Sequence, residues 1–238
     1  MNKKVNPNLI KLAEQTHNPN LKIDETMFEM QVEEIEQTTA PDLKGYIYVP
    51  SIKLYVAKER SLKGKNWNQA QEELKKQKVS MPTPYQFREF LKFLRDSKNR
   101  EHTEIFNDIT EVRSPWRAEW LNARFEERNG LYMISENVLV NGRYQDIEQK
   151  LDNYLNKDKI PGISLDEWIN SNASHGLPIA KMGKGPLYYR PPVKGCVAWF
   201  VSGSAWAALY CPRLPDSSSA SLGVFACAEG AVAKNSRR

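Results

Sequence analysis

The sequence has 238 residues, of which 40% are hydrophobic and 26% are charged, with a formal net charge of +5. Six Trp, ten Tyr and eight Phe supply enough apolar surface for a real core, which excludes a disordered chain. Lysines and arginines occur in short groups among Asp and Glu, so we expect a solvated surface and no nucleic-acid partner.

The N-terminal residues lack a continuous apolar segment of signal-peptide length, and no stretch reaches the roughly 20 apolar residues of a membrane span. We therefore expect a soluble product without a membrane span. Assembly into a particle, or export to a surface by another route, is left open, as is the oligomeric state.

Residues 1–40 are rich in Asn and Lys, and Pro7 and Pro19 would interrupt any long helix. We predict an N-terminal helical arm here, followed by a linker at 38–42 and a main domain over 41–238. The runs at 45–49 and 53–57 are rich in β-branched and aromatic residues and predict the first strands of that domain.

Two amphipathic helices are predicted next. Asn66 is a suitable N-cap for a helix reaching about Gln77, whose acidic residues come early and whose lysines come late. Thr83 is a cap with Pro84 at the first helical position, and an apolar stripe follows it.

Asn129–Gly130 and Asn141–Gly142 are strong turn signals between strand-like runs and predict hairpins. The stretch at about 145–180 is Lys-rich and carries a helix cap at Ser164, so we interpret it as a helical insertion.

The composition changes after Gly195: Asn is absent from 196–229 and Lys is absent until Lys234. Ala207, Leu209 and Cys211 alternate as the inward face of a strand should. The interleaved residues share neither size nor polarity, which an ordinary solvent-facing strand would not show. The interleaved residues therefore indicate a constraint other than ordinary strand packing; the alternative is an ordinary strand of mixed composition followed by a Ser-rich loop.

Several motifs from this part of the chain resemble the variable proteins of diversity-generating retroelements. They are Val197-Ala-Trp-Phe200, Ser202-Gly-Ser204 and Ser221-Leu-Gly-Val-Phe-Ala-Cys-Ala-Glu-Gly230, with Met81-Pro-Thr83 and Trp120-Leu-Asn-Ala-Arg-Phe125 as looser matches upstream. The resemblance covers roughly residues 44–230. It implies an α+β, C-type lectin-like fold similar to that of formylglycine-generating enzymes, with small antiparallel sheets.

The resemblance also implies that residues at about 196–229 form a diversified surface for an unknown protein or surface ligand. The ligand-binding positions would be Val201, Gly203, Trp206, Ala208, Tyr210, Pro212, Leu214, Asp216 and Ser218. Mutagenesis of template adenines in Asn codons reaches every one of these residue types except Trp. Trp206, and Trp199 nearby, would need a different template codon.

No catalytic, metal or cofactor site is predicted. Cys196, Cys211 and Cys227 show no CxxC spacing, and the three histidines lack a recognisable Cys, Asp or Glu partner. We expect three reduced thiols, with one disulfide as the alternative; thiol counting on the denatured, unreduced protein would distinguish them. The alternative functions are a lectin-fold enzyme and a structural domain with nucleic-acid affinity.

Two buried strands that pair with each other are predicted at 196–200 and 222–227, because both runs are apolar at consecutive positions. Trp206 and Tyr210 are expected to be exposed and to form one contiguous patch with the other seven positions.

Overall fold

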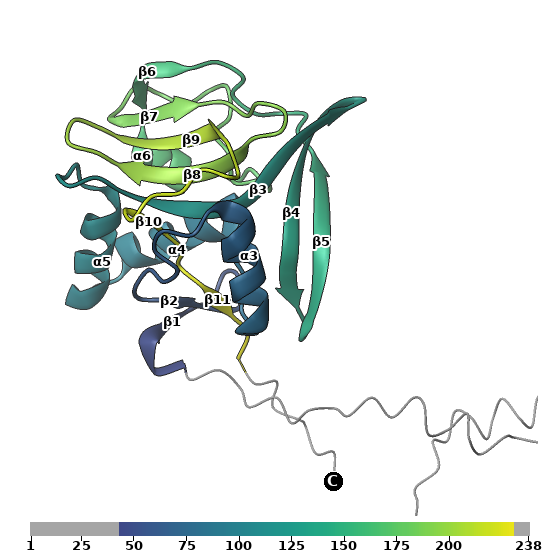
Figure 1. Cartoon of the computed structure of the whole chain (residues 1–238). Helices are drawn as coiled ribbons and strands as arrows, with labels where there is room; N and C mark the ends of the chain where they lie inside the picture. The colour runs from purple at the N-terminus through teal and green to yellow at the C-terminus, as the bar shows by residue number, and fades with distance from the viewer. Residues whose placement is uncertain (1–42, 231–238) are drawn as a thin grey trace, which may run out of the picture. The chain divides into compact units, whose positions relative to one another are not determined.

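A computed structural model describes residues 43–230 (Figure 1). After a short 3-10 turn, η1 (Leu43–Gly45), the first predicted strands form an antiparallel hairpin of β1 (Tyr46–Val49) and β2 (Leu54–Ala57). β11 (Cys227–Ala228), from the far end of the described chain, pairs antiparallel with β2. This three-stranded sheet therefore joins the beginning of the described segment to its end.

A larger, eight-stranded sheet runs in the order β5-β4-β3-β8-β9-β7-β6, and β10 (Leu222–Gly223) pairs with β3 beside this path. Adjacent strands are antiparallel except for two parallel pairs, β7 with β9 and β10 with β3. The long β3 links the β6-β9 layer to the projecting β4-β5 hairpin (Figure 1). The strands are β3 (Arg117–Arg128), β4 (Gly130–Val140), β5 (Arg143–Lys150), β6 (Lys159–Ile163), β7 (Leu187–Arg190), β8 (Val197–Ser202) and β9 (Ala207–Arg213).

Both predicted amphipathic helices are confirmed. α3 (Trp67–Lys76) begins after Asn66, whose side chain accepts from the Gln69 backbone N–H while the Gln69 side chain caps in return. α4 (Pro84–Asp96) begins with the same reciprocal arrangement between Thr83 and Gln86. Each arrangement satisfies two backbone donors that the first helical turn leaves free.

The core lies on both faces of β8, which is buried along its whole length. On one face, Ala198 and Phe200 join a cluster that includes Phe87 and Phe90 of α4. On the other face, the alternate residues of β8 pack in a second cluster with Trp67 of α3 and Trp120 of β3. A strand covered on both sides explains the unbroken apolar run in the sequence.

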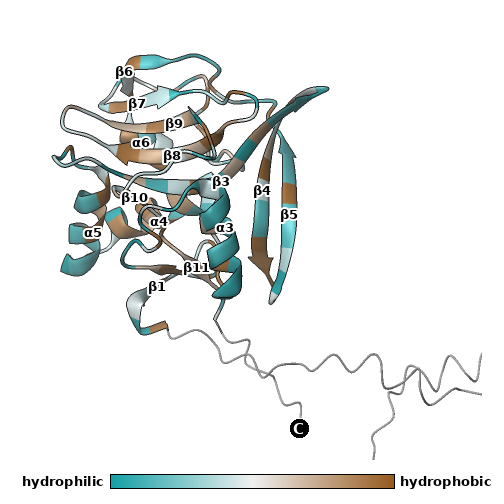
Figure 2. Cartoon of the chain, viewed as in Figure 1, coloured by the Kyte–Doolittle hydropathy of each residue, from teal (hydrophilic) through white to brown (hydrophobic). Residues whose placement is uncertain are grey.

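Residues 145–180 are not a helical insertion, and that prediction is wrong. Asn141 and Gly142 both have positive φ, at 53° and 74°, so the chain turns back and β5 pairs with β4. β5 is an edge strand with little burial, and its ribbon is hydrophilic apart from one apolar band (Figure 2). Ile147 is its one aliphatic residue. An exposed edge strand shows no alternation, so its period could not be read from sequence.

The region of Pro161–Gly162 forms a strand where a turn between helices was expected. β6 occupies the region of Pro161–Gly162, and a Cβ at Gly162 would lie 1.9 Å from the Leu187 backbone oxygen, so only glycine permits this approach of β7. The one expected helix that does form there is α6 (Leu165–Ile169), which Ser164 caps as predicted.

α5 (Arg100–Thr110) was not predicted. Ile109 is its only fully buried residue among those described, so its apolar face is too small to stand out in the sequence.

The predicted α+β class is confirmed, with four α-helices in the described part of the chain rather than two and an insertion. The segments 196–200 and 222–227 are buried as predicted. The predicted pairing between them is wrong: β8 lies between β3 and β9, whereas the second segment divides into β10 on β3 and β11 on β2. The arm predicted at 1–40 lies outside the described residues.

Candidate ligand-binding surface

Eight of the nine predicted binding positions fall into three groups, and Pro212 lies between the second and the third. Val201, Gly203 and Ala208 are buried, and the expectation that they are exposed is wrong. Val201 and Ala208 stand opposite each other in the β8-β9 ladder and pack into the second core cluster. They therefore form the floor of the surface and not its contact layer.

The second group is aromatic. Trp206, in the turn between β8 and β9, has 36% of its surface exposed, and its ring stacks on Tyr188 of β7 with centroids 5.9 Å apart and planes at 10°. Tyr210 is half-buried, because its ring packs edge-on against Trp199 at 6.0 Å. Trp206 thus meets the expected exposure, and Tyr210 meets it only in part.

The third group follows β9 in the sequence and packs in space against the first turn of α3. Leu214 is 64% exposed, and Asp216 and Ser218 are exposed as well. The Asp216 carboxylate accepts a hydrogen bond from the Asn68 side chain at 3.1 Å, so this loop is held against α3. The loop does not line the depression in which Trp206 lies.

A β-bulge separates the first two groups from the third. Val197 pairs with Arg213 and Trp199 with Tyr210, so two residue steps on β8 match three on β9. The extra residue reverses the alternation, which places Arg213 on the face of Tyr210 where the sequence predicted Pro212. Pro212 is half-buried and does not line the depression.

Trp199 is the centre of an aromatic array on this face. Its ring lies 5.9 Å from Trp116, 6.0 Å from Trp120 and 6.0 Å from Tyr210. The Arg213 guanidinium lies over the Trp199 ring at 4.5 Å, within the range of a cation–π contact.

An open depression of about 330 Å³ lies over this array. Its lining combines three tryptophans with a single cation and contains no carboxylate: Trp116, Trp199, Val201, Gly203, Ser204, Trp206 and Arg213. Aromatic rings and arginine are the residue types that contribute most to protein–protein binding energy. The arrangement can therefore bind a partner through apolar rings and one positive charge.

Sequence reasoning missed Trp116, Tyr188 and Arg213. Trp116 lies between α5 and β3, 83 residues before Trp199, and no local pattern links the two. Arg213 could have been found only by locating the bulge, for which Pro212 in a strand was the available signal.

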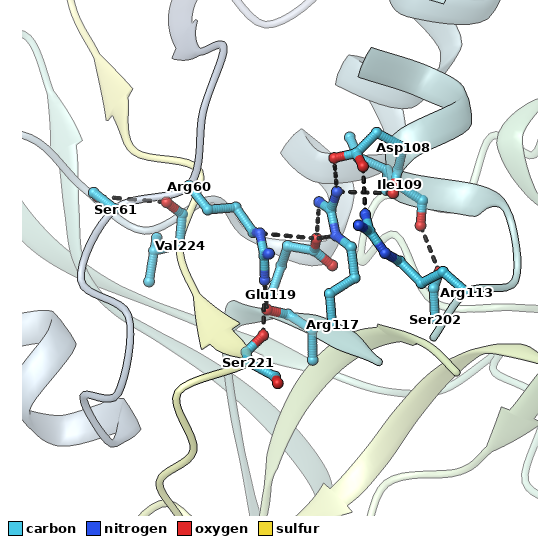
Figure 3. Close-up of polar contacts among 11 residues, drawn as sticks. Arg60, Ser61, Asp108, Ile109, Arg113, Arg117, Glu119, Ser202, Ser221 and Val224 are labelled. Carbon is cyan, nitrogen blue, oxygen red and sulfur yellow. Dashed lines mark hydrogen bonds and ion pairs between the residues drawn. The ribbon is translucent and has the colours of Figure 1, made fainter. Parts of the chain in front are cut away.

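Beneath the surface, a charged cluster holds the ends of the segment between β8 and β10 (Figure 3). At the first end, the Ser202 hydroxyl donates to the Ile109 oxygen at 2.6 Å, and the Arg113 N–H donates to the Gly203 oxygen at 2.7 Å. At the second end, Arg60 donates to the Ser221 oxygen at 2.8 Å.

Glu119 is the buried centre of this cluster, only 1% exposed. Its Oε1 accepts from Arg117 Nε at 2.8 Å and lies 3.8 Å from Arg60 Nε, while Arg117 also pairs with Asp108. Burial raises the pKa of the Glu119 carboxyl above its ordinary value, and the charges of Arg117 and Arg60 oppose that rise.

All three cysteines are free and buried, as predicted. Burial raises the pKa of the Cys227 thiol to about 12 and that of Cys211 further still. Within residues 43–230, no group of three or more His, Cys, Asp or Glu side chains is placed to hold a metal ion.

Comparisons with protein-family models, with curated proteins and with solved structures find no match to this chain. No helix in the described segment has the length and apolar character needed to cross a membrane.

Proposed function

We propose that this protein recognises ligands through the aromatic face of β7, β8 and β9, and that it is a retroelement-diversified variable protein with a C-type lectin-like fold. The observation that carries the proposal is the cluster that the exposed Trp116 and Trp206 and the half-buried Arg213 form around the Trp199 ring. Apolar rings left in contact with water on one face are typical of a binding site.

The framework around this face supports the proposal. Hydrogen bonds from buried or half-buried side chains hold Ser202 at one end of the segment and Ser221 at the other. Between these ends lie the exposed residues Trp206, Leu214 and Asp216. Substitutions between two fixed ends change the contact surface with little effect on the core, which is what a diversified binding protein requires.

The DNA flanking the gene tests this proposal directly. We expect a near-copy of codons 196–229 beside a reverse transcriptase gene. Its differences from the gene should fall at adenines in the codons of residues such as Tyr210, Leu214 and Asp216, while the codons for the framework run 222–227 stay identical. Absence of such a copy, or differences spread evenly over framework codons, would contradict the proposal.

A further inference from the structure

Arg213 differs from Arg190 of β7, and from the arginines of the charged cluster beneath this face, in having no acidic partner. Arg190 lies 3.4 Å from Asp158, and both Arg113 and Arg117 pair with Asp108. The Arg213 side chain makes no ion pair or hydrogen bond with any described residue, and its guanidinium lies over the Trp199 ring. Its charge is therefore uncompensated beside the depression that it lines.

The surroundings of Arg213 contain unmet hydrogen-bond donors. Its Nε is buried without an acceptor, and so is the indole N–H of Trp199, a residue only 8% exposed. The lining holds no Asp, Glu, Asn or Gln side chain that could accept from either group. A half-buried cation stacked on a ring and lacking an acceptor is a strong attractor for an anion.

We propose that the depression binds a carboxylate side chain, an Asp or Glu of a protein partner, paired with the Arg213 guanidinium and flanked by the rings of Trp116 and Trp206. This proposal rests on the proposed function, because it names the chemistry of the ligand at the same face. A planar guanidinium can bind a carboxylate through two parallel hydrogen bonds, which fixes orientation as well as charge.

The lining favours a protein partner over an acidic saccharide. A saccharide presents many hydroxyl donors and needs side-chain acceptors to match them, whereas Ser204 supplies the only side-chain oxygen in this lining. An acidic residue set among apolar neighbours matches the combination of tryptophan rings with one arginine.

A synthetic peptide array tests the proposal on the full chain. Each peptide carries one Glu or Asp flanked by Leu or Phe, and its matched partner carries Gln or Asn at that position. We expect the wild-type protein to bind the acidic peptides at least tenfold more tightly. Arg213→Gln should abolish that preference, Arg213→Lys should retain part of it, and Arg190→Gln, on the same face but already paired, should keep it.

The carboxylate proposal would be overturned by equal binding of acidic and amide peptides, by an acid preference that survives Arg213→Gln, or by tighter binding of 3′-sialyllactose than of any acidic peptide. Lack of binding to every acidic peptide would overturn it too. Thermal unfolding of each variant verifies that it is folded. If peptides bind without acid preference and Trp206→Ala removes that binding, the proposed function stands while the carboxylate proposal fails.

Discussion

Trp120 and Trp206 have opposite environments. Trp120 is completely buried, and its indole N–H donates to the Lys65 oxygen at 3.1 Å. Trp206 is more than a third exposed and makes one stacking contact, with Tyr188. Truncation should therefore separate a binding role from a packing role.

We expect Trp206→Ala to lower the free energy of unfolding by about 1 kcal/mol or less, because more than a third of the side chain already faces water and its one ring contact is with Tyr188. Trp120→Ala should lower it by about 3–5 kcal/mol through the cavity left behind. Tyr210→Ala should lie between them, at about 1–2 kcal/mol, since its ring packs against Trp199. Urea unfolding measures all three.

In the peptide-array experiment, Trp206→Ala should weaken binding although the protein remains folded. A stability loss for Trp206→Ala as large as that for Trp120→Ala would show that Trp206 is ordinary core packing and would remove it from the binding surface.

At the scale of elements, the segment between α6 and β7 has no regular structure but is fixed at several points. Arg88 of α4 donates to the Ala173 oxygen at 2.9 Å, and the Trp168 indole donates to the Gly176 oxygen at 2.9 Å. His175 uses both ring nitrogens: Nδ1 accepts from the Leu177 N–H, so Nε2 carries the proton donated to the Asn153 oxygen, each at 2.9 Å. The neutral ring therefore joins this segment to the one that follows β5.

Burial lowers the pKa of His175 below its ordinary value, so the folded protein binds a proton here less readily than the unfolded chain. Its contribution to stability is present above the unfolded pKa of about 6.5 and is lost as the pH falls below that value. We therefore expect the urea concentration at the midpoint of unfolding to decrease as the pH is lowered from 7.5 to 5.5. His175→Gln should lower the midpoint at pH 7.5 and flatten its dependence on pH.

His102→Gln, which replaces a histidine on α5, is the matched control and should retain the wild-type pH dependence. If His175→Gln keeps the same slope as the wild type between pH 7.5 and 5.5, His175 is not the group responsible.

At the scale of the whole molecule, the charged cluster around Glu119 connects parts of the chain that are distant in sequence. Arg60 follows β2, Asp108 belongs to α5, and Ser221 precedes β10 (Figure 3). Through Arg60, Glu119 is linked to the backbone oxygens of Ser221 and Ala118, at 2.8 and 3.0 Å. The cluster therefore positions the face of β7, β8 and β9 without forming part of it.

Glu119→Gln should lower the free energy of unfolding by about 3–5 kcal/mol, because it leaves Arg117 and Arg60 without their buried counter-charge. Glu73→Gln, which removes a surface pair with Lys76, should leave the urea midpoint unchanged. A Glu119→Gln variant as stable as the wild type would mean that the hydrogen bonds, and not the charge, hold the cluster together.

The sequence by itself determined those features whose causes are local. Asn66 and Thr83 cap helices through bonds within one turn, and Asn129–Gly130 and Asn141–Gly142 reverse the chain through their own backbone preferences. The burial of Cys211 also followed from apolar alternation along one strand.

The tertiary structure alone decided those features that depend on neighbours far along the chain. The bulge that brings Arg213 onto the binding face arises from the pairing of β9 with β8, and β5 became a strand because β4 offered an edge. The site itself needs Trp116 beside Trp199, a contact between residues far apart in sequence. Local propensity carries no information about which distant side chain completes a surface, because packing across the sheet selects that partner.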